Sequence, residues 1–336
     1  MAPLRCIIMI EMNDSITILT RRPLAQNYAY LVLRVVRHPI IMFKEISRRK
    51  SILGGHPAVT SSLLEGLKGL GLKYKYDPIV DKKITSKVVV LSDPEALRLS
   101  IKLKEKGYIS VLFAGPNVMV KANDFDNLYS NENIDRILVP SKWVEYSYQF
   151  ENPDTKNRLL IWPSGIDMKK WKAIAKKDYK SIILYEKYPR AELKKDFYQN
   201  IINKLSKMGY RVIIIKYGQY NEKEYKAALN SSSAMIYVSK SESQGIALLE
   251  AWAMNIPTFV WDSDFKKEGK RVFKDISPAP YLNKDTGKLW KSINDLAECL
   301  NSIKKESYRP RIYASKYFTN EKSVKLLIDE INSKNW

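Results

Sequence analysis

Short apolar runs alternate with helical stretches through most of the chain. Runs rich in β-branched and aromatic residues predict strands at 87–91, 110–114, 136–139, 181–185, 211–216, 234–238 and 258–261. This alternation predicts an α/β protein with two parallel sheets covered by helices. Ligands of such sheets bind at the carboxyl ends of the strands, so we expect the functional site in a cleft between two domains.

Helices are predicted between the strands. Residues 94–106 have a helical pattern, and Leu193, Phe197, Ile201 and Leu205 recur at four-residue spacing. Such spacing places the apolar side chains on one face, where they can pack against a sheet.

The composition bounds the kind of protein. A chain of 336 residues with 45% hydrophobic and 28% charged residues is long enough for two globular domains. Cys6 and Cys299 are too few and too far apart for a disulfide framework, and with no cleavable secretory signal they indicate a reducing, cytoplasmic location. The net charge of +21 favours anionic partners. Nucleotide sugars, phospholipid headgroups and nucleic acid all qualify, and the charge does not choose among them.

A predicted helix over residues 246–254 begins directly after Gly245. Glycine permits a tight turn and a close approach of the backbone to a ligand, and Asn255 and Pro257 end the helix. The first N–H groups of such a helix are unpaired and lie at the positive end of its dipole. We therefore expect an anion such as a diphosphate to bind there.

Glu242 and Glu250 lie on either side of this turn. Glu250 is on a helix with almost no other charge, and a carboxylate in apolar surroundings is costly unless a partner donates hydrogen bonds to it. The two hydroxyls of a ribose can bind both oxygens of one carboxylate, as they do in dinucleotide-binding folds. The pattern thus favours a nucleotide as the ligand.

The same segment resembles the donor-site signature of retaining, nucleotide-sugar-dependent glycosyltransferases of the GT-B fold, the glycosyl transferases group 1 type. The resemblance lies in Glu242, seven intervening residues and Glu250, followed by Ala-Trp-Ala at 251–253 and Asn-Ile-Pro at 255–257. Three further segments resemble supporting parts of the family pattern: the hinge at 161–167 with Trp171, the last strand and loop of the first domain at 135–143, and its glycine-bearing first loop at Gly54-Gly55-His56-Pro57.

The resemblance implies a GT-B fold, in which two Rossmann-like domains have parallel sheets facing a central cleft. It implies a helical amino-terminal extension over 1–50, an acceptor domain over 51–162, a donor domain over 163–318, and a helix over 319–336 that crosses back to the first domain. The implied reaction transfers a sugar from a UDP- or GDP-sugar to a glycan, lipid or protein acceptor with retention of configuration. The nucleotide sugar is then a co-substrate, and no other cofactor and no metal is expected.

The family pattern also implies roles for residues of this chain. Catalytic roles fall on Glu242, against the donor sugar, and on Lys187 and Arg190, which oppose the charge that builds on the departing diphosphate. His56 falls on the acceptor side. The implied donor-binding residues are Glu250, Ser243, Gln244, Gly245, Ile246, Ala247, Tyr217, Gly218, Gly54 and Gly55.

The loop that carries the cations departs from the family pattern. The family usually has glycine-arginine and then a lysine, whereas this chain has Glu-Lys-Tyr-Pro-Arg at 186–190, followed by Lys194 and Lys195. The sequence therefore leaves open which cation contacts the diphosphate.

Two alternatives remain. Asp262-Ser263-Asp264 directly follows a predicted strand, like the metal-binding triplet of GT-A glycosyltransferases, and Asp124-Phe125-Asp126 is a weaker match. The metal-free interpretation is favoured because Asp262 is explained as the end of that strand. The second alternative is a non-catalytic, basic binding protein on the same fold, which the charge of +21 suggests; on the favoured interpretation no nucleic acid is a partner.

The first 50 residues fit the family least. Residues 28–43 are strongly apolar, but Arg34, Arg37 and Pro39 interrupt them, so their uncharged runs fall far short of the roughly 20 residues needed to cross a bilayer. With basic residues on both sides, residues 28–50 fit peripheral contact with the inner face of an anionic membrane. The alternative is a helical extension packed on the first domain.

Overall fold

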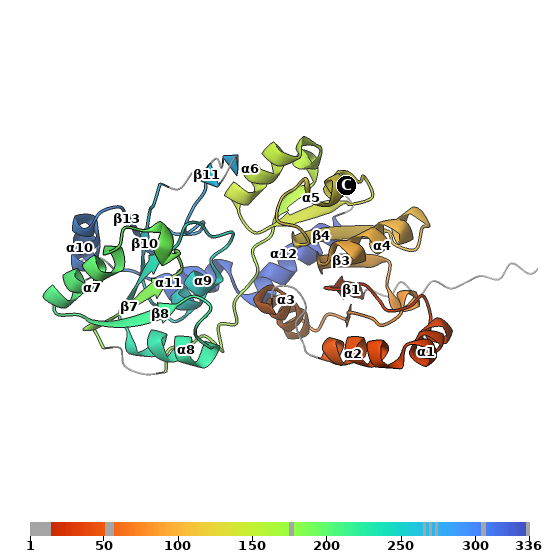
Figure 1. The fold of residues 1–336 in the computed structure, drawn as a ribbon, viewed down its shortest axis with the longest axis horizontal. Coiled ribbons are helices and arrows are strands. Elements are labelled where there is room, and N and C mark those ends of the chain that lie inside the picture. Colours follow the sequence, from red (N-terminus) through yellow and green to blue (C-terminus); the bar gives the residue numbers. More distant parts are fainter. Residues whose placement is uncertain are drawn as a thin grey trace, which may run out of the picture. The chain divides into compact units, whose positions relative to one another are not determined.

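The computed structural model describes residues 15–50, 57–174, 178–264, 267–268, 271–272, 275–303 and 307–333 (Figure 1). The chain divides into two compact units, the first made of Met1–Leu138 with Glu330–Trp336 and the second of Val139–Asp329. Parallel sheets with helices around them form the core of the fold, which confirms the architecture predicted from the alternating pattern.

The first sheet has the strand order β2-β1-β3-β4-β5-β6. Its strands are β1 (Ile16–Leu19), β2 (Tyr74–Tyr76), β3 (Lys87–Ser92), β4 (Val111–Asn117), β5 (Arg136–Val139) and β6 (Leu159–Ile161). Strand β1 pairs in parallel with β2 and β3, β3 with β4, and β4 with β5. The division between the two units falls within β5, after Leu138.

The strands β3, β4 and β5 confirm three predicted strands, whereas β1 differs from the prediction. Residues 16–19 lie in the range predicted as a helical extension, but they form a strand between β2 and β3. All four side chains are buried, as expected of a short apolar run that is covered on both faces of a parallel sheet. The run is too short for a helical period to be distinguished.

Helices and turns connect these strands. They are α1 (Tyr28–Arg37), α2 (Pro39–Lys50), α3 (Pro57–Gly69), η1 (Asp81–Lys83), α4 (Pro94–Glu105), α5 (Asp124–Asn127), η2 (Leu128–Ser130), α6 (Lys142–Glu151) and η3 (Pro153–Arg158). Helix α4 confirms the prediction for residues 94–106. Asp93 caps it by accepting a hydrogen bond from the N–H of Glu95, and Pro94 occupies the first turn, where a missing N–H costs nothing.

The second sheet has the strand order β13-β10-β9-β7-β8, and its pairs are parallel. Strands β7 (Ser181–Glu186), β8 (Arg211–Lys216), β9 (Ala234–Val238) and β10 (Thr258–Trp261) confirm four predicted strands, and β13 (Gly287–Trp290) was not predicted. Strands β11 (Lys267–Glu268) and β12 (Arg271–Val272) form a separate antiparallel pair.

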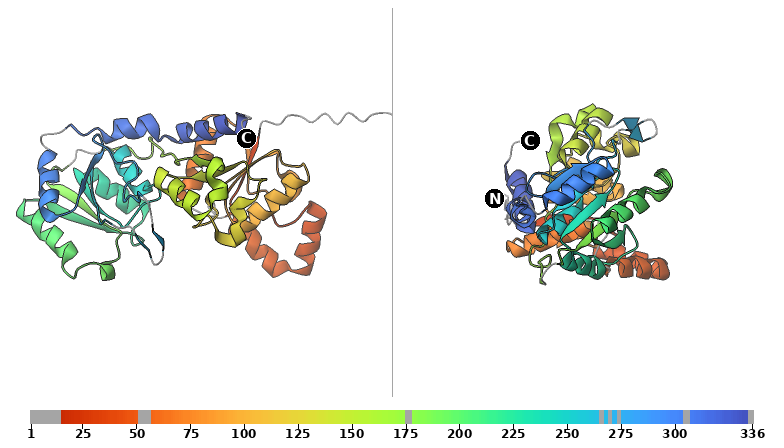
Figure 2. Two further views of the ribbon diagram at one scale, coloured as in Figure 1. Left: turned by 90° about the horizontal axis from the view of Figure 1, so that it is seen from above. Right: turned by 90° about the vertical axis from the view of Figure 1, so that its left-hand side faces the viewer.

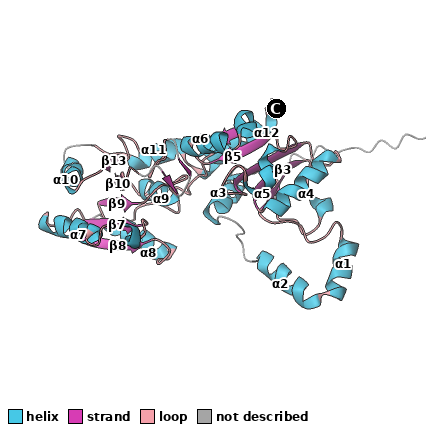
Figure 3. Ribbon diagram, turned by 45° about the horizontal axis from the view of Figure 1, so that its top comes forward, coloured by secondary structure: helices cyan, strands magenta, loops and turns pink. Residues whose placement is uncertain are grey.

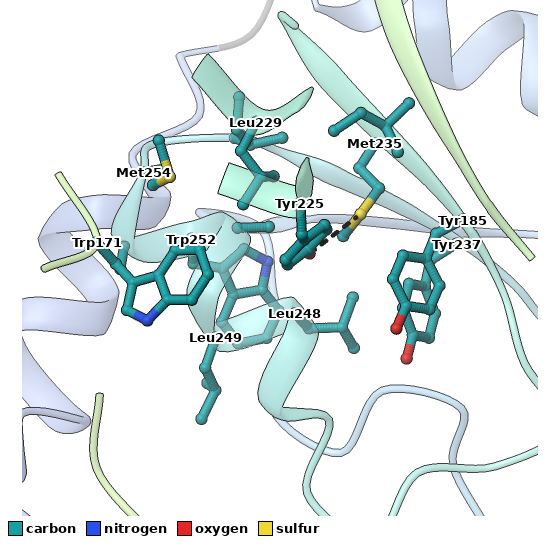
Figure 4. Close-up of a cluster of buried hydrophobic side chains, with 14 of the residues drawn as sticks. Trp171, Tyr185, Tyr225, Leu229, Met235, Tyr237, Leu248, Leu249, Trp252 and Met254 are labelled. Carbon is teal, nitrogen blue, oxygen red and sulfur yellow. Dashed lines mark hydrogen bonds between the residues drawn. The ribbon is translucent and has the colours of Figure 1, made fainter. Parts of the chain in front are cut away.

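Helices cover both faces of the second sheet. Ile182 and Leu184 belong to the core beneath α7 (Phe197–Lys207) and α10 (Ile293–Ser302), which lie side by side in Figure 2. The alternate residues of β7 pack into the opposite core, formed with α8 (Glu222–Ser231), α9 (Ile246–Ala253) and α11 (Pro310–Tyr317). Figure 4 shows this second cluster, where Tyr185 and Tyr237 stack beside Leu248 of α9.

One predicted helix begins later than expected. The spacing from Leu193 predicted a helix through Leu205, but α7 begins at Phe197, after the 3₁₀ turn η4 (Arg190–Glu192). Leu193 still packs against the same core as α7, so it contributes to the apolar pattern without being helical.

The segment 161–167 is held by the start of α12 (Asn320–Asn332). Trp162 is fully buried and donates from Nε1 to the carbonyl of Ser323 at 2.9 Å. A side chain at Gly165 would lie 2.5 Å from the Cα of Asn320, so only glycine permits this approach. Helix α12 matches the predicted terminal helix; it begins within the second unit and ends within the first, where Glu330 pairs with Arg136 at 2.7 Å.

Candidate functional site

The loops that follow β7 and β9 start next to each other at the carboxyl edge of the second sheet. Glu186 pairs with Val238 at the ends of these neighbouring strands. The N–H groups of Lys187 and Tyr188 both donate to the carbonyl of Val238 at 2.9 Å. Two segments far apart in sequence therefore meet at the edge where ligands of parallel sheets bind.

Glu242 is buried in this place, and polar groups satisfy both of its carboxylate oxygens. Oε1 accepts hydrogen bonds from Tyr237 Oη at 2.7 Å and Ser239 Oγ at 2.9 Å. Lys187 Nζ lies 2.8 Å from each oxygen, and Oε2 has the lysine as its partner. The ion pair and the two hydroxyl donors offset the cost of burying the carboxylate.

Lys187 is the accessible member of the pair. Its side chain is 26% exposed, compared with 7% for Glu242. The ammonium also lies 4.6 Å from the centre of the Tyr217 ring, in a cation–π contact. Tyr217 follows β8 directly and is itself exposed, and the positive φ of Gly218 turns the chain away after it.

The turn before α9 has the geometry expected of an anion-binding helix start. Gly245 has a φ of +81°, and a Cβ at this position would lie 2.9 Å from a methyl carbon of Leu248. Among the described residues, none accepts a hydrogen bond from the N–H groups of residues 243–247. Ser243 is exposed, and Ile246 and Ala247 are partly buried.

The side chain of Gln244 forms hydrogen bonds with the segment 161–167. Its Nε2 donates to the carbonyl of Ser164 at 2.7 Å, and its Oε1 accepts from the N–H of Ser164 at 3.0 Å. This pair of hydrogen bonds fixes the loop before α9 to the segment that resembles a hinge. Only the backbone of Gln244 is therefore available to contact a ligand.

Glu250 is partly buried on α9, one turn after Ile246. Burial raises the pKa of its carboxyl to about 8, the nearby negative charge of Glu222 adds to the rise, and Lys170 opposes it. Among the described residues, none donates a hydrogen bond to this carboxyl group. A partly buried acid without a donor is suited to accept hydrogen bonds from a ligand.

Tyrosines connect the surroundings of the two glutamates. Tyr185 stacks on Tyr237, with ring centres 4.7 Å apart, and its hydroxyl lies 2.6 Å from that of Tyr220. Burial raises the pKa of Tyr220, and the charges of both Glu250 and Glu242 contribute to the rise. Tyr237 and Ser239 were not identified from the sequence. The available signal was a hydroxyl-bearing residue near the end of the otherwise aliphatic strand β9, a few positions before Glu242.

The predicted residues fall into three groups. The structure brings together Glu242, Lys187 and Tyr217, and places Gly245 and Glu250 on the adjoining turn and helix. Arg190 opens the 3₁₀ turn that follows β7, three positions after Lys187. Ser243, Gln244, Ile246 and Ala247 flank Gly245, and Gly218 follows Tyr217, whereas Gly54, Gly55 and His56 lie outside the described residues.

The aspartates of the GT-A alternative form a separate cluster with a lysine. Lys291 Nζ lies 2.9 Å from Asp264 Oδ1 and 3.5 Å from Asp262 Oδ2. The N–H of Asp264 donates to Asp262 Oδ1 at 3.1 Å. In the part of the chain that the structure describes, no group of three or more histidine, cysteine, aspartate or glutamate residues is placed to hold a metal ion.

No described helix is long and apolar enough to pass through a bilayer.

The same architecture occurs in solved glycosyltransferase structures. A glycosyltransferase from Rickettsia africae ESF-5 matches over 96% of this chain and 100% of its own, with 12% sequence identity and a TM-score of 0.55. The apo form of the lipopolysaccharide outer core galactosyltransferase WaaB matches over 79% of this chain and 85% of its own, with 15% identity and a TM-score of 0.50. No family model and no curated protein matches the sequence. The chain has the GT-B fold, with two Rossmann-like α/β domains, as the sequence resemblance implied.

Proposed function

We propose that this protein is a retaining glycosyltransferase that moves a sugar from a nucleoside diphosphate sugar to a glycan, lipid or protein acceptor. The observation that carries the proposal is the accessible ammonium of Lys187. It is held 2.8 Å from both oxygens of Glu242. Glu242 belongs to the loop after β9, which leads to the N–H groups before α9 that no described residue pairs. A fixed cation and a helix start together suit a diphosphate.

In the proposed reaction, the bond between the anomeric carbon and the diphosphate oxygen breaks. The acceptor hydroxyl oxygen forms its bond on the same face of the sugar, and its proton passes to the departing phosphate. Negative charge grows on the diphosphate during this step. Lys187, Arg190 and the N–H groups at the start of α9 therefore stabilise the transition state more than the bound substrate.

Glu242 has two roles in this proposal. It first holds Lys187 in place, since both of its oxygens lie within bonding distance of the ammonium. When Lys187 turns to the diphosphate, Oε2 becomes free to accept a hydrogen bond from a sugar hydroxyl. Tyr237 and Ser239 keep Oε1 in place during this exchange.

Glu250 and Tyr217 are proposed to bind the nucleoside. Glu250 has a carboxyl group that no described residue supplies with a hydrogen bond, and the two hydroxyls of a ribose can fill both oxygens. Tyr217 offers an exposed ring for stacking of the base, and Gly218 beside it leaves the approach open. The proposed co-substrate is a UDP- or GDP-sugar.

We propose that the reaction is independent of a metal ion. The cations and N–H groups around Lys187 meet the phosphate charge, whereas Asp262 and Asp264 are paired with Lys291. The GT-B fold of the chain supports this proposal over the GT-A alternative.

A thermal-shift panel of nucleotides and nucleotide sugars tests the proposal. A ligand at 100 times its Kd stabilises the folded protein by about 2.7 kcal/mol, so the matching nucleotide sugar should raise Tm clearly. The same nucleotide should raise the Tm of Lys207→Ala, which changes an exposed lysine at the far end of α7. If no nucleotide shifts Tm while DNA or RNA does so at low salt only, the chain is a basic binding protein and the proposal is wrong.

A further inference from the structure

Helices α1 and α2 carry apolar side chains that the rest of the first unit does not cover. The exposed large apolar residues of this pair are Tyr28, Tyr30, Val32, Leu33, Val35, Val36, Ile40, Ile41 and Phe43, here called the apolar helix surface. Single exposed apolar residues are normal on a protein, but a patch of them marks an interaction site. Figure 3 shows the two helices as a pair that stands away from the first sheet.

The orientation of α1 places its apolar face outward. Tyr28, Val32 and Val36 follow at four-residue spacing and share one face, and α1 has no buried residue. The side chain of Arg34, on the polar face, donates a hydrogen bond to the carbonyl of Leu24. This bond holds Arg34 toward the chain that precedes the helix, whereas Tyr28, Val32 and Val36 are 57%, 60% and 73% exposed.

Helix α2 is buried at one position and exposed at others. Met42 is 1% exposed, whereas Ile40 and Phe43 are 72% and 73% exposed. Burial within the fold thus accounts for Met42. It does not account for the exposed members of the apolar helix surface.

The surroundings of this surface are basic. Among the residues whose side chains the structure describes, Arg34, Arg37 and Lys44 lie on these two helices, with one acid, Glu45. Apolar side chains within a basic rim match the two layers of an anionic lipid surface, acyl chains below and charged headgroups above. A second copy of the chain fits less well, because a symmetric contact through this surface would bring the two basic rims together.

We propose that α1 and α2 dock the protein on an anionic membrane, with the apolar helix surface in the interface. The ten residues of α1 span about 15 Å, roughly half the thickness of a bilayer core, so the helix is too short to cross it, and in the proposed docking it lies along the surface. Docking of this kind is independent of the proposed sugar transfer, because it uses none of the residues at the carboxyl edge of the second sheet.

Co-sedimentation of the full chain with vesicles tests the proposal without any sugar substrate. The protein should pellet with phosphatidylcholine vesicles that contain phosphatidylglycerol and remain in solution with pure phosphatidylcholine. Replacing Val36, Ile40 and Phe43 with glutamine should weaken partitioning by at least about tenfold. The matched control replaces Tyr108, Val120 and Ile312, which are 61–75% exposed elsewhere in the chain, and should pellet like the wild type.

A second pair of variants tests the basic rim. Arg37→Gln with Lys44→Gln should weaken partitioning by roughly fivefold for each charge removed, and added salt should do the same. Lys102→Gln with Lys106→Gln, exposed lysines at the end of α4, is the control. Hydrogen exchange should slow in peptides covering residues 28–43 when acidic vesicles are added.

Three results would overturn the proposal. One is failure of the wild type to pellet with acidic vesicles at low salt. Another is equal partitioning of the apolar variant and its control. The third is a dimer, seen by light scattering, that forms through this surface and is lost in the apolar variant without any vesicle binding.

Discussion

The ammonium of Lys187 lies 2.8 Å from the carboxylate of Glu242, although 55 positions of sequence separate the two residues. They meet because β7 and β9 are neighbouring parallel strands, whose following loops start at the same edge of the sheet. The carboxylate is buried and the ammonium is partly exposed, so the pair presents one positive group to a ligand. This arrangement leads to predictions for both stability and turnover.

The first prediction concerns the stability of the pair. Lys187→Met should lower the free energy of unfolding by about 1–3 kcal/mol, because it leaves a buried carboxylate without its counter-charge. Glu242→Gln alone should also destabilise, and the double variant should lose less than the sum, with a coupling of about 0.5–3 kcal/mol. Urea unfolding measures the cycle, with Lys207→Met as the control. Additive losses would show that the two groups do not interact in solution.

The second prediction concerns turnover. Lys187→Met should lower kcat by about 10²–10³-fold with a smaller change in KM, because the cation opposes charge that develops in the transition state. Lys187→Arg should recover part of the loss, since it retains the charge with different geometry. Steady-state release of the nucleotide measures both. A kcat within twofold of wild type in a folded Lys187→Met protein would show that this lysine has no role in the proposed reaction.

The third prediction concerns Glu250. Glu250→Gln keeps the shape of the side chain but not its ability to accept two hydroxyl hydrogens, so nucleotide binding should weaken by about 1–3 kcal/mol in calorimetry. The variant should be more stable than the wild type when no ligand is present, because it removes the cost of a charge in a partly buried site. An unchanged nucleotide affinity in a folded Glu250→Gln protein would show that Glu250 does not bind the ribose.

The pattern of apolar residues along the sequence predicts most of the fold. Strands such as β7 and β9 are continuous apolar runs, typical of strands covered on both faces, and they were predicted within a residue. Strand β1 was missed because four residues are too few to show a period. The start of α7 was misplaced because Leu193 contributes to the core from outside the helix, which apolar spacing cannot distinguish from a helical turn.

The candidate site was only partly visible in the sequence. Glu242 and Glu250 could be selected because carboxylates around a glycine at a helix start are chemically distinctive. The partners Tyr237 and Ser239 could not be selected, because their role depends on how the loop after β9 folds back on the end of the strand. The hydrogen bond from Gln244 to Ser164 is likewise a tertiary contact, which the spacing of residues in the sequence does not show.

The fourth prediction is a pH dependence that follows from the raised pKa of Glu250. The folded pKa is about 8 and the ordinary value is 4.5, so the folded state binds this proton more tightly than the unfolded state. Stability should therefore fall as pH rises from about 4.5 to about 8 and level off above that. The stability advantage of Glu250→Gln should be smallest at the acidic end of this window and largest above it.

Nucleotide-sugar binding should show the opposite trend with pH. In the proposed complex, ribose hydroxyls donate to the charged carboxylate, so binding below pH 8 must displace a proton, and affinity should rise toward that pH. A nucleotide sugar is the right probe, because a free terminal phosphate titrates near pH 6 and would add its own dependence. Glu250→Gln should abolish the trend. An affinity that falls as pH rises would instead mean that the neutral carboxyl donates to the ligand.

The fifth prediction separates the metal-free proposal from a metal-dependent one. Turnover should persist in excess chelator, because in the proposed mechanism Lys187, Arg190 and the N–H groups before α9 supply the positive field at the diphosphate. Asp262→Asn should be mild for activity, since Asp262 faces Lys291 at 3.5 Å in a largely exposed cluster whose ion pairs contribute at most about 1 kcal/mol. Complete loss of turnover in chelator that manganese or magnesium restores, together with inactivation by Asp262→Asn, would assign the phosphate charge to a bound cation at these aspartates.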